Sequence, residues 1–370
     1  MGNQVVYSLA FSGNNIFAGT YINGVYLSTN NGTNWTQTSL NNRTVEALAV
    51  NGNNIFAGTS GYGVYVSTNN GTSWTQTSLN NRSIGSLAVN GNTIFAGTFL
   101  YGVYLSTNNG TNWTQTSFNN ESVWSLAANG NNIFAGSYGV YVSTNNGTNW
   151  TQTSLNNRFV RALATSGNNI FAGTNNPSSS YGVYLSTDNG TSWTQTSLNN
   201  QKVFALAVNG NNIFAGTISN GVYVSNNNGT SWTQRNEGFR DSTSVYALCI
   251  LNNYIFAGTF GGGVYRRPLG ELTGIQPISN EIPNQFSLSQ NYPNPFNPKT
   301  VISFQLAVNS FASLKVYDLL GREVATLVNE QLQPGTYEVD FDGSNFASGV
   351  YYYKLVAGEY TETRKMILMK

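Results

Sequence analysis

The sequence predicts an all-β protein, a seven-bladed β-propeller followed by a small immunoglobulin-like β-sandwich. Two observations predict this fold class. A strand-rich unit recurs along the first part of the chain, and a run of alternating strands fills its last part. We place the propeller at residues 1–267, a linker at residues 268–283 and the second domain at residues 284–370.

The repeating unit is marked by the motif Ile-Phe-Ala-Gly. Its copies begin at Ile16, Ile55, Ile94, Ile133, Ile170, Ile213 and Ile255, with spacings of 39, 39, 39, 37, 43 and 42 residues. A period of about 40 residues is typical of propeller blades with four strands each. In the second copy we expect strands at residues 45–50, 55–59 and 63–67 and a fourth strand from Trp74, because these segments are rich in β-formers and separated by Asn/Gly clusters.

A second motif, Ser-Thr-Asn-Asn-Gly-Thr-Asn-Trp, separates the third strand from the fourth. It or a close variant occupies residues 28–35, 67–74, 106–113, 143–150, 186–193 and 225–232. The pattern resembles the Asp box, also called the bacterial neuraminidase repeat, with the form Ser-x-Asp-x-Gly-x-x-Trp. Asp188 alone keeps the acid, and Asn replaces it elsewhere. We expect a structural role, in which the Asx side chain accepts hydrogen bonds from the turn and the Trp ring is buried between sheets.

The seventh unit departs from this pattern. It has strand-like segments at residues 245–251, 255–259 and 263–267, followed by Pro268 and no box. We expect its fourth strand either to be missing or to come from residues 272–276. The N-terminus is a poor source for that strand, because the chain enters directly at an inner strand.

The tail predicts a second domain. Strands are expected at residues 301–306, 312–318, 323–328, 336–341, 350–355 and 360–368, a pattern typical of an immunoglobulin-like sandwich. The opening motif Asn291-Tyr-Pro-Asn-Pro-Phe-Asn-Pro298, together with residues 316–324, 334–337, 347–351 and 365–368, closely resembles the type IX secretion C-terminal sorting domain of Bacteroidetes-type bacteria. The resemblance implies the type IX secretion machinery as a partner and a secreted or surface-attached protein.

Composition excludes several classes of function. Charged residues make up 8% of the chain, the net charge is +1 and no basic run is present, which disfavours a nucleic-acid or acidic-membrane partner. No stretch is apolar enough to span a membrane. The chain has no His, and its Asp-box loops have almost no carboxylates, so we expect no metal and no cofactor. Cys249 stands where other repeats have Ala, so we expect it to be a small buried side chain.

We expect no signal peptide within the first residues of this sequence. Residues 1–11 lack a basic start followed by an apolar run, whereas cargo of the type IX system normally needs a signal peptide. We therefore expect that the sequence is truncated at its N-terminus.

Comparison of the repeats predicts a binding face. In a four-stranded meander, the first and third turns share one face and the remaining connections share the other. Loop lengths never vary on the first face, whereas length and residue identity both vary on the second. Functional residues commonly lie on variable loops held by a rigid scaffold. The candidate ligand-binding residues are Trp124, Arg161, Phe204, Tyr246, Tyr7, Glu46, Tyr138 and Tyr181.

The candidate residues are not equally informative. Tyr138 and Tyr181 precede the Gly of the Gly-Val-Tyr motif, as do Tyr62 and Tyr101, so packing on the next blade is an equally good interpretation for these four. We expect the ligand to lie over repeats four to seven, where four other candidates form an arc, namely Trp124, Arg161, Phe204 and Tyr246. The long loop at residues 174–181 is expected to stand beside that arc.

The aromatic face predicts a binding or adhesion protein that recognises an extracellular glycan or protein. The alternative is a sialidase-like or other glycoside hydrolase that acts on extracellular polysaccharide. Such chemistry needs two carboxylates, or a Tyr nucleophile with an acid and an arginine cluster. The acids of the expected propeller are Glu46, Glu121, Asp188, Glu237 and Asp241. This shortage of acids, together with the absence of the sialidase Arg-Ile-Pro signature, favours a protein without enzymatic activity.

Overall fold

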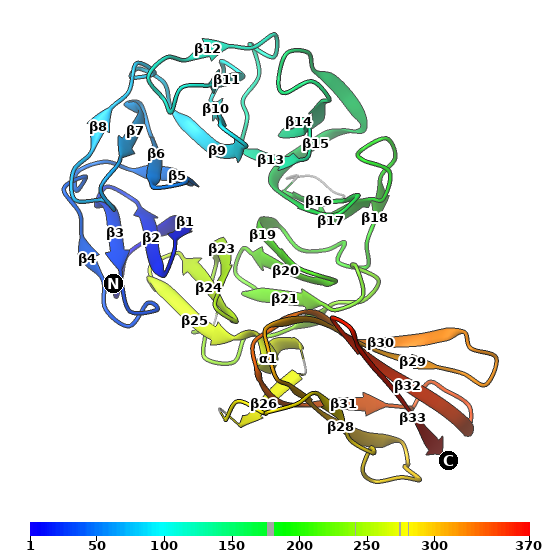
Figure 1. Ribbon diagram of the computed structural model, residues 1–370. Coiled ribbons are helices and arrows are strands. Elements are labelled where there is room, and N and C mark those ends of the chain that lie inside the picture. The colour runs from blue at the N-terminus through cyan, green and yellow to red at the C-terminus, as the bar shows by residue number, and fades with distance from the viewer. Residues whose placement is uncertain (176–180, 241, 274, 280) are drawn as a thin grey trace. The chain divides into compact units, whose positions relative to one another are not determined.

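Figure 1 shows the computed structural model, which describes residues 1–175, 181–240, 242–273, 275–279 and 281–370. The chain divides into two compact units. The first comprises Met1–Val208, Ile213–Leu251 and Ile255–Arg266, and the second comprises Asn209–Asn212, Asn252–Tyr254 and Arg267–Lys370. Within these described ranges, the single α-helix is α1 (Leu269–Thr273), and all other regular structure is β-strand.

The described part of the first unit contains six hydrogen-bonded sheets. Four of them have four strands each, β1–β4, β5–β8, β9–β12 and β19–β22, whereas β13–β18 form one sheet of six strands and β23–β25 a sheet of three. Figure 1 shows the sheets arranged around a common centre, with one strand of each repeat nearest to it. The inner strands are β1 (Val6–Ser12), β5 (Val45–Asn51), β9 (Ile84–Asn90), β13 (Ser125–Asn129), β15 (Thr151–Ser166), β19 (Val203–Asn209) and β23 (Val245–Leu251).

The second and third strands of the repeats follow outward from the inner ones. The second strands are β2 (Asn15–Thr20), β6 (Asn54–Thr59), β10 (Thr93–Thr98), β14 (Asn132–Ser143), β16 (Asn169–Thr174), β20 (Asn212–Thr217) and β24 (Tyr254–Thr259). The third strands are β3 (Gly24–Ser28), β7 (Gly63–Ser67), β11 (Val103–Ser106), β17 (Gly182–Ser186), β21 (Val222–Ser225) and β25 (Val264–Pro268). Short fourth strands close the sheets, namely β4 (Thr36–Gln37), β8 (Thr75–Gln76), β12 (Thr114–Gln115), β18 (Thr194–Gln195) and β22 (Thr233–Gln234).

The six-stranded sheet arises where two repeats share long strands. β14 runs through segments that form two separate strands elsewhere, because only Ser137 and Tyr138 stand where other repeats have a four-residue loop. β15 likewise continues from the outer segment of one repeat into the inner segment of the next. The shortened loop therefore merges two strands of one repeat, and β15 joins that repeat to the next in one sheet.

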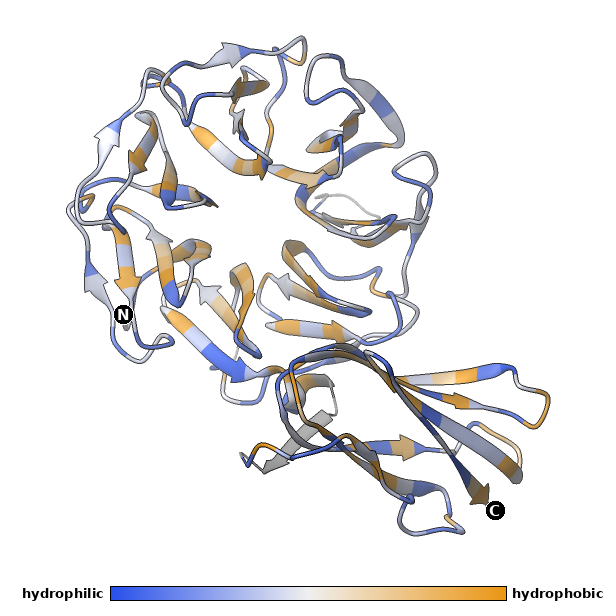
Figure 2. Cartoon of the chain, in the orientation of Figure 1, coloured by the Kyte–Doolittle hydropathy of each residue, from blue (hydrophilic) through white to orange (hydrophobic). Residues whose placement is uncertain are grey.

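The core of this unit lies between neighbouring sheets. Phe17 and Val25 of the first sheet pack with Val45 and Ile55 of the second, and all four are fully buried. A fully buried Phe, Val or Ile contributes roughly 1.5–3 kcal/mol each. Figure 2 shows that hydrophobic residues are concentrated in the strands and hydrophilic residues in the connecting loops. Gly19 permits this close packing, since a Cβ there would lie 2.7 Å from Val45 Cγ1.

The box between the third and fourth strands is a hydrogen-bonded turn. Ser67 Oγ accepts a bond from Gly71 N at 2.8 Å, and Asn69 Oδ1 accepts one from Ser73 N at 2.9 Å. Asn therefore performs the acceptor role that an Asp would perform, without charge. At Asp188, which keeps the acid, hydrogen bonds from Ser192 and Ser186 lower the carboxyl pKa to about 2.

The box Trp bonds to the preceding repeat in four of the six boxes. Trp74 is half-buried against the cluster between the first and second sheets. Its indole N–H donates to Thr38 Oγ1 of the preceding repeat at 3.2 Å. The ring was expected between sheets, and the structure places it there with one edge still accessible to solvent.

The seventh repeat has three strands within the described residues. Residues 272–276 do not supply a fourth, because β26 (Ile275–Ser279) pairs with β31 (Gly335–Asp342) of the second unit. The N-terminal residues do reach this repeat, since Gly263 N donates to Gln4 O at 3.0 Å. In the first repeat, Gly24 N donates to Arg43 O in the equivalent way.

The second unit consists of two four-stranded antiparallel sheets. One has the order β26-β31-β28-β27 and the other the order β30-β29-β32-β33. A single buried cluster includes residues from both sheets, among them Ile302, Leu314 and Tyr353. The remaining strands are β27 (Ser287–Leu288), β28 (Lys299–Leu306), β29 (Ser310–Tyr317), β30 (Glu323–Leu332), β32 (Gly349–Ala357) and β33 (Tyr360–Leu368).

The opening motif of the second unit is held by its core. Asn291 is buried, and its backbone N–H donates to the Tyr353 hydroxyl at 2.8 Å. Its side-chain amide donates to Thr300 Oγ1 at 2.9 Å. The structure differs from the expected linker at residues 268–283, since α1 and β26 lie there. Main-chain pairing of β26 with β31 is the physical reason for the difference.

Candidate binding site in the central pocket

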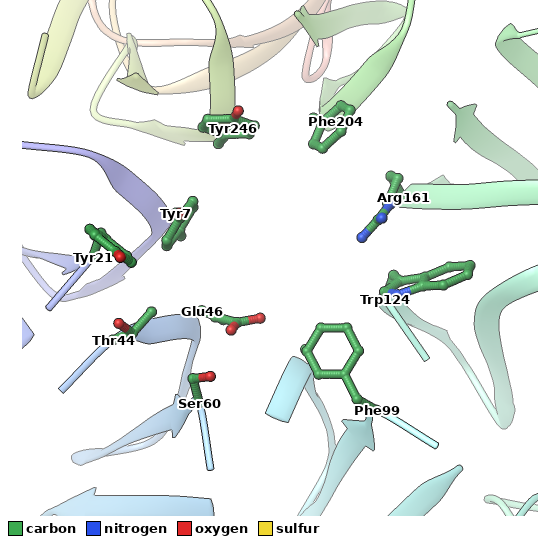
Figure 3. A pocket seen from close by; sticks show the side chains of 11 residues that line it. Tyr7, Tyr21, Thr44, Glu46, Ser60, Phe99, Trp124, Arg161, Phe204 and Tyr246 are labelled. Atoms are coloured by element: carbon green, nitrogen blue, oxygen red, sulfur yellow. The ribbon is translucent and has the colours of Figure 1, made fainter. Parts of the chain in front are cut away.

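A pocket of about 500 Å³ lies at the centre of the first unit. Seven equivalent positions, one in each repeat, line it, and four further residues complete its wall. We call it the central pocket, defined by Tyr7, Tyr21, Thr44, Glu46, Ser60, Gly85, Phe99, Trp124, Arg161, Phe204 and Tyr246 (Figure 3). Its size is that of a site for a small molecule or for the end of a larger one.

β-Bulges explain why one position per repeat faces the pocket. In β1 the register shifts between Val6 and Ser8, so Tyr7 has no partner in β2. The register shifts in the same way at Glu46, Gly85 and Arg161. A bulge leaves one residue outside the ladder and re-aims its side chain. The strand pairing itself therefore turns these positions toward the pocket.

Aromatic rings form a continuous arc along one side. The ring centroids lie 6.3 Å apart for Tyr21 and Tyr7, 5.6 Å for Tyr7 and Tyr246, and 5.3 Å for Tyr246 and Phe204. Each pair is edge-to-face, the arrangement that aromatic quadrupoles favour. The arc expected over repeats four to seven thus continues into the first repeat, because β1 lies beside β23.

Arg161 continues the arc between two rings. Its guanidinium carbon lies 4.6 Å from the Trp124 ring centroid and 5.7 Å from that of Phe204. Burial lowers the pKa of the guanidinium, and the nearby Glu46 carboxylate partly opposes that shift. Arg161 Nε is buried and has no hydrogen-bond partner.

Glu46 supplies the one carboxylate of the pocket wall. Burial raises its pKa, whereas a hydrogen bond from Ser60 and the positive charge of Arg161 lower it, and the net shift is upward. The described ion pairs include none between Glu46 and Arg161. Figure 3 shows both charged ends pointing into the pocket from different sides.

The third repeat differs, because it has Gly85 at the lining position. A Cβ there would lie 2.8 Å from Val123 O and 3.4 Å from a ring carbon of Phe99. The Phe99 ring therefore occupies the space that a side chain at position 85 would take. Little apolar surface was expected on the side of Glu46 and Gly85, but Phe99 adds an apolar ring to that side of the pocket.

Six of the candidate residues from the sequence line the pocket, and two do not. Trp124, Arg161, Phe204, Tyr246, Tyr7 and Glu46 are brought together. Tyr138 is instead 44% exposed, with its ring centroid 5.1 Å from that of Phe159. Tyr181 is half-buried away from the lining residues. The loop at residues 174–181, expected beside the arc, lies largely outside the described residues.

Tyr62 and Tyr101 were considered as residues that pack on the next blade, but their described ring contacts are with arginines. The Arg43 guanidinium lies 4.0 Å from the Tyr62 ring centroid, and that of Arg82 lies 4.1 Å from Tyr101. These tyrosines are therefore partly covered by arginines from the loop that precedes the same repeat.

Sequence reasoning left five lining residues out of the candidate set, namely Gly85, which has no side chain, and four others. Tyr21, Ser60 and Phe99 hold equivalent places, each directly after the Thr that follows Ile-Phe-Ala-Gly. The residue type at this position varies among the repeats, and that variation could have identified these three residues from the sequence. Thr44 precedes an inner strand and carries no comparable signal, since small polar residues are common in these loops.

The described residues contain no cluster of three or more His, Cys, Asp or Glu side chains that could hold a metal ion. The polar chemistry of the pocket therefore rests on one carboxylate, one guanidinium, and the hydroxyls of Thr44, Ser60 and its tyrosines. No helix in the part of the chain that the structure describes is long and apolar enough to cross a membrane.

Solved structures share the fold of the first unit at low sequence identity. A structure titled YCF48 bound to D1 peptide is 15% identical with a TM-score of 0.59, covering 72% of this chain and 92% of that one. YCF48 from Cyanidioschyzon merolae is 14% identical with a TM-score of 0.59, covering 72% and 96%. The WD40 β-propeller domain of Doa1 is 15% identical with a TM-score of 0.55, covering 72% and 93%. The first unit is therefore similar to β-propellers.

Sequence comparison decides the nature of the tail. Residues 290–369 match the family model described as a secretion system C-terminal sorting domain. The tail is a type IX secretion sorting domain. The sorting domain implies interaction with the type IX machinery and a secreted or outer-surface protein. No curated protein is recognisably similar to this sequence.

Proposed function

We propose that this chain is a secreted or surface-attached binding protein that captures an extracellular glycan or protein in its central pocket. The observation that carries the proposal is the arc of Tyr21, Tyr7, Tyr246 and Phe204, continued by the Arg161 guanidinium 4.6 Å from the Trp124 ring centroid. Rings held in place by one another offer rigid flat surfaces, which lose little entropy when a sugar or a side chain stacks on them.

The pocket favours binding over hydrolysis. A glycoside hydrolase generally needs two carboxylates, or a Tyr nucleophile with an acid and several arginines. Glu46 and Arg161 are the one carboxylate and the one guanidinium among the residues that line the pocket. The raised pKa of Glu46 is a property of general acids. That shift follows from burial, however, and the pocket offers no second carboxylate as partner.

The shared fold is compatible with peptide binding. One propeller of similar fold is titled as bound to a peptide. At 15% identity this likeness extends to the fold alone, and the ligand has to be argued from the pocket of this chain.

The proposal includes the finer identity of both units. We assign seven blades, because seven inner strands line one axial cavity and β14 and β15 each carry segments of two blades. We assign the turns to the Asp-box type, supported by the bonds of Ser67 and Asn69. We assign the second unit to the immunoglobulin-like sandwiches, with domains at residues 1–267 and 284–370, and α1 and β26 in the segment between them.

A paired binding and hydrolysis screen tests the function. The full chain is applied to glycan and peptide arrays and incubated with sialidase and polysaccharide substrates. Trp124→Ala with Phe204→Ala should weaken any array ligand about 30-fold, because two stacking contacts are each worth about 1 kcal/mol. Thermal unfolding should change little, since both residues lie on the pocket wall.

A variant on the opposite face serves as the control. Asn51 lies at the end of β5 and donates a long hydrogen bond of 3.4 Å to Asn109. Asn51→Ala should leave ligand affinity unchanged. Loss of binding in Asn51→Ala with retention in the aromatic double variant would place the site on the wrong face. Turnover of a glycan by the wild type would favour the hydrolase.

A further inference from the structure

Two opposite charges in the central pocket are not joined in any of the described ion pairs. Glu46 lies in β5 and Arg161 in β15, with β9 and β13 between them along the inner wall. Burial disfavours the charged form of both, as the opposite shifts of their pKa values indicate. The pocket therefore holds two partly desolvated charges that act on each other electrostatically without forming a close ion pair.

The guanidinium is fixed in a geometry suited to an anion. Its central carbon lies over the Trp124 ring at 4.6 Å and over the Phe204 ring at 5.7 Å. Nε is buried without a bonding partner, so the terminal N–H edge, which Figure 3 shows directed into the pocket, is the part available to a ligand. Such an edge matches the two oxygens of a carboxylate.

The Glu46 carboxylate is placed where it can bind a cation. Ser60 donates to Glu46, which orients one side of the group. The Tyr7 hydroxyl is close enough for the two groups to interact electrostatically. Figure 3 shows the carboxylate oxygens directed into the open space of the pocket. An ammonium group entering that space would meet an unpaired acceptor next to ring edges and hydroxyls.

The geometry points to a zwitterionic ligand, with a carboxylate bound by Arg161, an ammonium group bound by Glu46, and an aliphatic segment between them against the rings. This inference rests on the proposed binding function and deepens it. The two protein charges stand on different sides of the pocket, so the ligand must hold its own charges apart. A lysine at the carboxyl end of a peptide has this chemistry, and so has a free ω-amino acid.

Three small probes separate the two charge contributions. Nα-Acetyl-lysine carries both charges, Nα-acetyl-lysine amide lacks the carboxylate, and Nα-acetyl-norleucine lacks the ammonium group. Binding to the full chain is followed by ligand-detected NMR and calorimetry. We expect Nα-acetyl-lysine to bind roughly tenfold or more tightly than either analogue, as usual for a lost charged hydrogen bond. 6-Aminohexanoate, which has no peptide group, distinguishes a free zwitterion from a peptide end.

Two variants assign each charge to its residue. Arg161→Gln should abolish the preference for the acid over the amide and keep the preference for lysine over norleucine. Glu46→Gln should do the reverse. Arg161→Lys and Glu46→Asp retain the charges, and circular dichroism of each variant verifies the fold. A merely structural role would weaken all probes equally and leave both preferences intact.

The outcomes separate this inference from the proposed function. If Nα-acetyl-lysine does not bind, or if both variants keep the wild-type selectivity, the inference of a zwitterionic ligand is wrong. If an array glycan then binds and loses affinity in the Trp124/Phe204 double variant, the pocket remains the binding site with another ligand class. If no ligand depends on these aromatic residues, the proposed function falls with it.

Discussion

At the scale of single residues, the pocket contains groups that act against stability. Glu46 is buried enough for its pKa to be raised despite a hydrogen bond and a nearby guanidinium. Asp188 shows the contrary case, since hydrogen bonds in its turn lower its pKa to about 2. Two acids of one unit therefore respond to pH with opposite signs, because one has lost water and the other has gained donors.

Replacing Glu46 should stabilise the free protein. A carboxyl with a raised folded-state pKa favours the folded state when protonated, so its ionisation costs stability as pH rises through that pKa. Glu46→Gln should therefore raise the free energy of unfolding at pH 7, and the gain should vanish below the ordinary value of 4.5. Urea unfolding followed by Trp fluorescence from pH 7 to pH 3.5 measures the effect.

Asp188→Asn is the matched comparison. Its lowered pKa gives stability that is present above the ordinary value of 3.8 and lost as pH falls through about 2. The Asn variant should be slightly less stable than the wild type at pH 7 and equal to it near pH 2. A stabilising Asp188→Asn, or a destabilising Glu46→Gln, would contradict the electrostatic account.

At the scale of elements, the box turns join consecutive sheets. Trp74 packs on the cluster shared by the first two sheets and bonds to Thr38 of the preceding repeat. The boxes at Trp113, Trp193 and Trp232 make the same bond to the preceding repeat. Stability in this unit therefore depends on contacts between neighbours as well as within each sheet.

Trp74→Ala should destabilise the first unit by roughly 2–3 kcal/mol, somewhat less than truncation of a fully buried Trp, because the ring is half-buried. Trp74→Phe should cost less, since it keeps an aromatic ring and loses the bond to Thr38. Chemical unfolding of both variants provides the comparison. Equal losses would mean that the indole hydrogen bond, rather than ring packing, carries the effect.

At the scale of the whole molecule, a unit similar to β-propellers is joined to a secretion sorting domain. The compact units meet in sequence at Arg266 and Arg267, ahead of α1 and β26. β26 pairs with β31, so it belongs with the sorting domain. A truncation at residue 284, the domain boundary expected from the sequence, would separate β26 from the β31 strand with which it pairs.

A chain ending at Arg266 should fold but fail to be exported. Expressed with a signal peptide in a host with a type IX system, it should accumulate in the periplasm, because it lacks the sorting domain at residues 290–369. A chain ending at residue 284 should also be retained and should aggregate more, since β26 loses its partner strand. Immunoblots of periplasm and medium report the location. Normal secretion of either form would refute the role of the tail.

The sequence by itself determined the repeats, most strand positions, the box turns and the sorting tail. These features depend on local physics, namely two-residue alternation, turn residues at fixed offsets and a motif within one segment. It also named six lining residues, because variation at one repeated position is visible without coordinates.

Only the tertiary structure decided which of these residues meet. Contact between β1 and β23 puts Tyr7 beside Tyr246, almost the whole unit apart in sequence. Within the third repeat, the Phe99 ring occupies the space above Gly85. Bulges turn Glu46 and Arg161 into one pocket, where none of the described ion pairs joins them. Pairing of β26 with β31 likewise joins segments far apart in the chain. Contacts of this kind depend on register and closure, which no local pattern encodes.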